Sequence, residues 1–265
     1  MDVPRDPALP STGRAPHEAA RERAHRTAQR AQQAQQHAAA AVRGKMNEVK
    51  PRLRGWFHAA ATPLTLSAGI VLVWLSPTIP TKIGSAVFTF AALLVFTVSG
   101  IYHRGNWSRR TWAFLRRFDH ANIFVLIAGS YTPFAVLFLH GSARITLLAV
   151  VWGAAVAGVV FRLFWTDAPR WLYTPMYIAL GWAAVFFVPE FLAGAHRFSA
   201  GVAIAVLVLV AVGGLLYTLG GVVYGLRKPD PWPRWFGFHE VFHSFTIVAF
   251  TCQYVAASLA TYSLR

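Results

Sequence analysis

The chain has 265 residues, of which 55% are hydrophobic and 13% charged, and its mean hydropathy is +0.44. These values are typical of a membrane protein and exclude an ordinary soluble domain. The single cysteine, Cys252, excludes an intrachain disulfide and a cysteine-rich metal site. The net charge of +15 would suggest nucleic acid in a soluble protein, but in a membrane protein the positions of the charges matter more than their sum.

Residues 1–55 differ in composition from the rest of the chain. The run from residue 17 to residue 41 is rich in Ala, Arg, Gln and His and contains no Leu, Ile, Phe or Trp. A helix formed there has no strongly apolar face to bury. We therefore predict a basic, solvated or disordered cytoplasmic tail over residues 1–55 and a membrane domain over residues 56–265.

From residue 56 onward, apolar runs alternate with short polar breaks. Each run is long enough to cross about 30 Å of hydrocarbon at about 1.5 Å per residue. The predicted spans are 57–75, 84–102, 121–139, 144–164, 171–189, 199–224 and 240–262. The fold class that follows is an all-α integral membrane protein, a seven-transmembrane helix bundle that is a multi-pass protein of the cell membrane.

Lys and Arg alternate between the two sides of these spans. Of the 25 such residues, 21 fall in the tail and in the breaks after the second, fourth and sixth spans, including the 103–120 loop. Cytoplasmic loops retain Lys and Arg. We therefore expect a cytoplasmic N-terminus and a C-terminus outside.

Polar residues gather where three of the spans meet the cytoplasmic side. His239 and His243 are four residues apart, so a helix places both rings on one face. His103 ends the second span, Ser99 lies one turn before it, and Asp119 lies at the start of the third span. Because successive spans run in opposite directions, all these groups are expected at one membrane depth.

Three neutral imidazoles with one open position are typical of a catalytic zinc site. The predicted metal ligands are His103, His239 and His243, with Zn²⁺ as the cofactor. Asp119 and Ser99 are the predicted catalytic residues: Asp119 is a general base for water or orients a ligand, and Ser99 orients an imidazole or the water. The alternative is a buried histidine–aspartate hydrogen-bond cluster that fastens three helices together.

Two neighbouring residues allow other interpretations. His239, Glu240 and His243 match the H-E-x-x-H pattern of zinc peptidases, in which the glutamate is the general base. No third ligand follows His243, so we expect the match to be accidental and Glu240 to favour the helix N-terminus. His58 either approaches the same site or, in the interpretation that we favour, is a polar residue at the membrane interface.

Three ordered motifs lie at matching helix ends: SGIYH at 99–103, RFDH at 117–120 followed by LIAGSYTP at 126–133, and FGFHEVFH at 236–243. Together they resemble the bacterial hemolysin III proteins, which belong with the progestin and adipoQ receptors, including the adiponectin receptors, and more distantly with alkaline ceramidases. The resemblance runs from about residue 52 to the C-terminus. It implies a seven-helix fold with a zinc site near the cytoplasmic face, in which His103, His239 and His243 bind zinc, Asp119 holds water and Ser99 is the motif serine.

The resemblance also links the chain to hydrolysis of ceramide amides. We expect a hemolysin III-like zinc-dependent hydrolase of a lipid amide or ester, with a membrane lipid as substrate or ligand and with neither nucleic acid nor a protein as partner. The alternatives are a non-catalytic sensor or regulator of membrane lipids with structural zinc, and a cytolytic pore-forming protein. A haem group clamped between two of the histidines is a further alternative.

Overall fold

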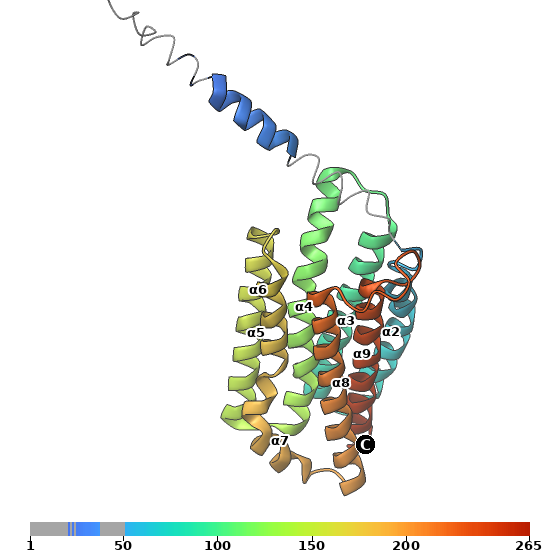
Figure 1. Cartoon of the computed structure of the whole chain (residues 1–265). Coiled ribbons are helices and arrows are strands. Elements are labelled where there is room, and N and C mark those ends of the chain that lie inside the picture. The colour runs from blue at the N-terminus through green and yellow to red at the C-terminus, as the bar shows by residue number, and fades with distance from the viewer. Residues whose placement is uncertain (1–20, 22, 24, 38–50) are drawn as a thin grey trace, which may run out of the picture. The chain divides into compact units, whose positions relative to one another are not determined.

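The computed structural model describes residues 21, 23, 25–37 and 51–265. It divides the chain into two compact units, residues 1–50 and residues 51–265. In the first unit, residues 25–37 form an exposed helix. The other residues of the predicted tail, as far as residue 50, lie outside the described residues. The second unit carries the membrane-spanning helices (Figure 1).

Seven segments of the second unit are long and apolar enough to cross a membrane. They are α2 (Trp56–Leu75), α3 (Ile79–Arg104), α4 (Arg109–Phe138), α5 (Gly141–Phe164), a three-part segment made of α6 (Arg170–Gly181), η1 (Ala183–Phe187) and α7 (Val188–Ala195), then α8 (Ala200–Leu226) and α9 (Phe238–Tyr262). No β-strand forms among residues 51–265. The predicted all-α, seven-helix fold is confirmed, and the chain is a multi-pass membrane protein.

The third span begins earlier than the sequence predicts. Residues 103–120 were expected to form a loop, whereas α4 begins at Arg109. The Ser108 hydroxyl accepts a hydrogen bond from the backbone N–H of Thr111 and so caps the helix. Hydropathy detects where a helix enters hydrocarbon and not where its backbone begins, so this polar extension was missed. Asp119 therefore lies well inside α4.

The fifth span, predicted as one helix over residues 171–189, is interrupted. α6 ends at Gly181, and a short 3₁₀ segment joins it to α7. The Tyr131 hydroxyl of α4 hydrogen-bonds the carbonyl oxygens of Leu180 and Gly181 and accepts from the backbone N–H of Ala184. Unpaired backbone groups are costly in lipid. Tyr131 therefore stabilises the interruption from the neighbouring helix.

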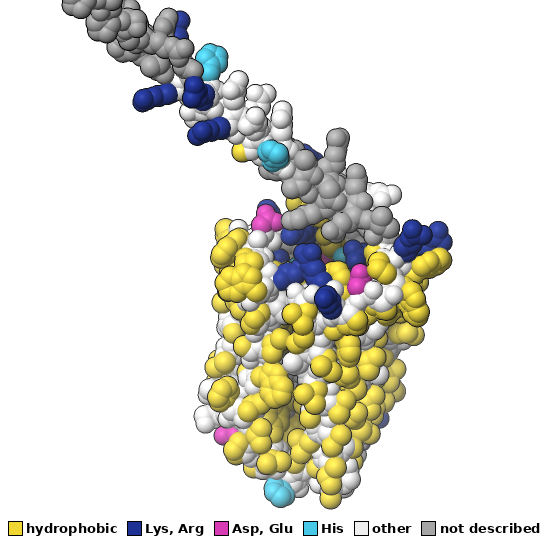
Figure 2. Space-filling view, in the orientation of Figure 1, with side chains coloured by type: hydrophobic (Ala, Val, Ile, Leu, Met, Phe, Trp, Pro, Cys, Tyr) yellow, Lys and Arg dark blue, Asp and Glu magenta, His cyan; other side chains and the backbone are white. Residues whose placement is uncertain are grey.

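α3, α4 and α9 are the most enclosed helices of the bundle. In the most apolar stretch of each, 61%, 72% and 50% of the residues are buried, against 17% for the fifth span and for α8. Figure 2 shows hydrophobic side chains over the side of the bundle and Lys and Arg gathered at one end. We call this end, where α3 ends and α4 and α9 begin, the histidine end. Polar groups on the three enclosed helices can meet there inside the protein.

Candidate metal centre

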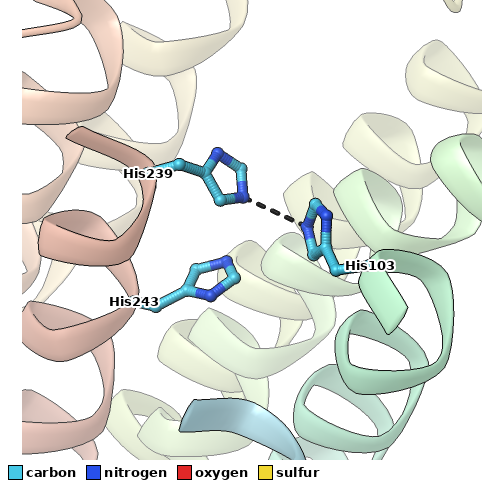
Figure 3. Close-up of side chains that lie close together, drawn as sticks. All are labelled: His103, His239 and His243. Atoms are coloured by element: carbon cyan, nitrogen blue, oxygen red, sulfur yellow. Dashed lines mark hydrogen bonds between the residues drawn. The ribbon is translucent and has the colours of Figure 1, made fainter. Parts of the chain in front are cut away.

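Three histidines from two helices face one another at the histidine end. His103 lies in the last turn of α3, and His239 and His243 lie in the first two turns of α9. One ligand nitrogen of each ring lies within 4.8 Å of the others, and Nε2 of His239 is 3.1 Å from Nε2 of His103. Figure 3 shows the three rings pointing toward one another between the helices. The structure thus brings the three predicted ligands together in the protein interior.

Two of the three donor nitrogens have the spacing of ligands on a tetrahedral metal ion. With metal–nitrogen distances of about 2.0–2.1 Å, as for zinc, two ligand nitrogens of a tetrahedron lie about 3.3–3.4 Å apart. The observed 3.1 Å between His103 and His239 is close to that value. Across the part of the chain that the structure describes, this is the one group of three or more His, Cys, Asp or Glu residues whose ligand atoms converge. A fourth coordination position would remain for water or a substrate oxygen.

Asp119 lies beside the histidine cluster. Its Oδ2 is 4.0 Å from Nε2 of His103 and 3.5 Å from Nδ1 of His120. Ser99, one turn before His103 on α3, is buried and lines the same cavity as Asp119. Asp119, Ser99, His239 and His243 all line one cavity. Both residues that were predicted to be catalytic therefore line the same cavity as two of the three histidines.

Glu240 occupies a different position from the glutamate of a peptidase site. It is fully buried, and its Oε1 accepts a hydrogen bond from Nε of Arg54 at 3.0 Å. Its Oε2 accepts one from the backbone N–H of Gly237 at 2.9 Å and so caps α9. The predicted role of Glu240 at the helix N-terminus is confirmed. With both oxygens engaged, it is a structural residue rather than a base.

His58 and His120 also lie near the cluster. His58 was expected at the membrane interface, but it is only 2% exposed and its ring stacks on that of His243. His120 contacts other residues: its Nε2 is 2.9 Å from the Tyr224 hydroxyl. The positions of both residues in the sequence indicate their depth in the membrane. The packing of the helices around them decides which one contacts a histidine of the cluster.

A cavity of about 330 Å³ extends from the histidine cluster into the bundle. Its walls come from α4, the fifth span, α8 and α9 and are mostly apolar. Its lining includes Asp119 and also Phe138, the last residue of the same helix. These residues are 19 positions apart, which corresponds to about 28 Å along an α-helix. The cavity therefore has the length and the polarity that suit a lipid chain.

The chain is similar in sequence to known proteins. The sequence model of the family described as "Haemolysin-III related" matches residues 46–254. The chain belongs to this family. The match includes the three histidines, Asp119 and Ser99, so the candidate metal centre lies in the part of the chain that the haemolysin-III-related family shares.

Two curated relatives within this family are of bacterial origin. The "Hemolysin-3 homolog" of Bacillus subtilis (strain 168) is 33% identical over 161 residues, which cover 61% of this chain and 69% of the relative. The "Hemolysin-3" of Bacillus cereus is 35% identical over 113 residues, which cover 42% of this chain and 47% of the relative. The resemblance to hemolysin III proteins that the three motifs indicated is confirmed.

Proposed function

We propose that this haemolysin-III-related protein is a zinc-dependent hydrolase of a lipid amide or ester. The observation that carries the proposal is a cluster of three imidazoles with an adjacent carboxylate at one end of a long apolar cavity. A reactive polar group and an apolar chain-binding space are joined in this arrangement. A membrane lipid supplies the matching pair, a polar head with an amide or ester and an acyl chain.

The residues have separate roles in this proposal. His103, His239 and His243 hold the metal ion. Zinc, when bound, supplies Lewis acidity that polarises a carbonyl and promotes the ionisation of water. The Asp119 carboxylate accepts the proton of the attacking water. Ser99 orients that carboxylate through its hydroxyl, and the apolar walls of the cavity bind the acyl chain and exclude bulk water.

The proposed site faces the cytoplasm, with the N-terminus inside and the C-terminus outside. The excess of Lys and Arg at the histidine end supports this orientation. A reporter fused after Arg265 that is active only outside the cytoplasm would report it. An active reporter agrees with the proposed orientation. An inactive reporter after Arg265, together with an active one in a loop on the opposite side, would show that the orientation is the reverse.

The decisive experiment combines metal quantification with a lipid screen on the purified full-length protein. We expect about one zinc per chain and metal-dependent release of fatty acid from a set of ceramides, glycerolipids and other acyl lipids. Release should stop in Asp119→Asn and in His239→Ala. Turnover that is unchanged in both variants would overturn the proposal.

A second candidate is a lipid sensor or regulator in which zinc is structural. It is favoured by the place of the three histidines, which join the end of α3 to the start of α9. In that case zinc removal would lower the thermal stability of the bundle, and no lipid in the screen would be turned over by the metal-loaded protein. The names of the two relatives raise a third candidate, a cytolytic pore, but the mostly apolar cavity offers no path for ions.

A further inference from the structure

Residues 52–58, which lead into α2 and form its first turn, contact the histidine cluster. They lie outside the three motifs that contain the cluster. We call this segment the α2 clasp. The backbone N–H groups of Arg52 and Leu53 donate to the carbonyl oxygens of Arg234 and Trp235, which precede α9. The Arg54 guanidinium then pairs with the buried Glu240 at 3.0 Å. The clasp is thereby joined to the helix that carries His239 and His243.

The clasp also contacts α3. Gly55 has a left-handed backbone conformation with φ of 80°, which favours glycine. A Cβ atom at this position would lie 2.8 Å from Cβ of His103, which is closer than real Cβ contacts. The chain therefore turns directly against His103. The clasp therefore contacts both α3 and α9. The separation of these two helices sets the distance between the ligand nitrogens of His103 and His239.

His58 contacts the third histidine of the cluster. Its ring and that of His243 are stacked, with centroids 3.8 Å apart and an interplanar angle of 16°. Phe96 of α3 packs against His58 with ring centroids 5.0 Å apart. His58 is thus held between α3 and the His243 ring, deep in the protein.

The orientation of the His243 ring needs an explanation. A metal-binding histidine usually donates its second ring N–H to a carboxylate or carbonyl, which fixes the ring. Among the described residues, Nδ1 of His243 is buried and has no hydrogen-bond partner. Ring packing is left to fix the orientation, and the flat face of His58 is the closest ring contact that His243 makes.

The same geometry argues against His58 as a fourth metal ligand. The lone pair of an imidazole nitrogen lies in the ring plane, so a metal ion bound by His243 lies in the plane of that ring. Because the two rings are nearly parallel and stacked, an ion held in the His243 plane would lie outside the His58 plane, in which the lone pairs of the His58 nitrogens lie. His58 acts through its ring face.

We propose that the α2 clasp positions the metal ligands of this site and that His58 is the positioning residue for His243. The inference rests on the proposed metal site and adds to it a residue outside the three family motifs. The flat ring of residue 58 orients His243, and the nitrogens of that ring play no part.

The test compares His58→Phe, which retains a flat ring, with His58→Leu, which fills similar volume without one, and with His58→Ala. Zinc affinity is measured by chelator competition, and the visible spectrum of the cobalt-loaded protein reports ligand geometry. We expect wild-type affinity and spectrum in His58→Phe. His58→Leu and His58→Ala should bind zinc about 10–100-fold more weakly, as for other groups that orient a ligand.

Phe90→Ala is the control, because it removes a strongly exposed ring of α3 that lies outside the clasp. It should leave affinity unchanged. A loss in His58→Phe as large as in His58→Ala would assign the role to the nitrogens and overturn the inference, as would wild-type affinity in His58→Leu. A wild-type protein that binds no zinc would overturn the proposed function as well, so the two failures are distinguishable.

Discussion

The two ends of the cavity are built by different interactions. At the histidine end, directional contacts hold the polar groups: an ion pair, a helix cap and short distances between ring nitrogens. At the other end, Phe138 packs on Phe191 and Phe198 with ring centroids 6.0 and 4.8 Å apart. We call this the phenylalanine end. Directional contacts fix atoms for chemistry, whereas ring packing sets only the shape of a space, so substitutions at the two ends should differ in kind.

The largest effect is expected from removing a ligand at the histidine end. His103→Ala should reduce bound zinc to near zero, measured by elemental analysis, and abolish lipid hydrolysis, because two imidazoles on one helix do not complete the site. The exposed His196 provides the control, and His196→Ala should retain wild-type zinc. Full zinc content in His103→Ala would show that the metal is bound elsewhere.

The next largest effect separates catalysis from metal binding at the same end. Asp119→Asn keeps the shape of the side chain but removes the base, so kcat for fatty-acid release should fall about 10²- to 10⁴-fold. Zinc content should remain that of the wild type. Asp167→Asn, on an exposed aspartate that pairs with Arg116, is the control. A parallel loss of zinc in Asp119→Asn would make Asp119 part of the metal site and not a base.

A smaller effect is expected on stability. Arg54→Ala leaves the Glu240 carboxylate buried without its ion-pair partner, which typically costs about 3–5 kcal/mol. The apparent Tm in detergent should fall by several degrees. Arg52→Ala is the matched control, because the Arg52 side chain covers the exposed ring of Trp235 and, among the described residues, pairs with no buried carboxylate. An equal fall in Tm in both variants would indicate that positive charge at this end, and not the buried ion pair, stabilises the bundle.

The smallest effect is expected at the phenylalanine end. Phe191 lines the cavity and is only partly buried, so Phe191→Ala should lengthen the space at modest loss of stability. Preference among acyl lipids, measured as kcat/KM for chains of increasing length, should shift several-fold toward longer chains, while zinc content stays constant. Phe186→Ala, on a strongly exposed ring outside the cavity, should cause no shift. A loss of zinc in Phe191→Ala would remove the distinction between the two ends.

The sequence predicted the histidine end better than it predicted its surroundings. The pair His239 and His243 and the depth of His103 follow from helical periodicity and from the order of apolar runs, which are local properties. His58 and His120 have equally clear depths, yet His58 stacks on a ligand while His120 pairs with Tyr224. Depth along a span is legible from hydropathy, but the direction of a side chain around its helix depends on which helix lies beside it.

The same division applies to the fold. The sequence by itself determined seven apolar spans, because lipid requires about 20 apolar residues for each crossing. It also indicated that His103, His239 and His243 lie at one membrane depth, from the spacing of the last two and the order of the spans. Only the tertiary structure decided the interruption of the fifth span beside Tyr131 and the contact of the α2 clasp with both ligand-bearing helices. These features depend on contacts between residues up to 186 positions apart, such as Arg54 and Glu240, and no periodicity in the chain encodes such pairs.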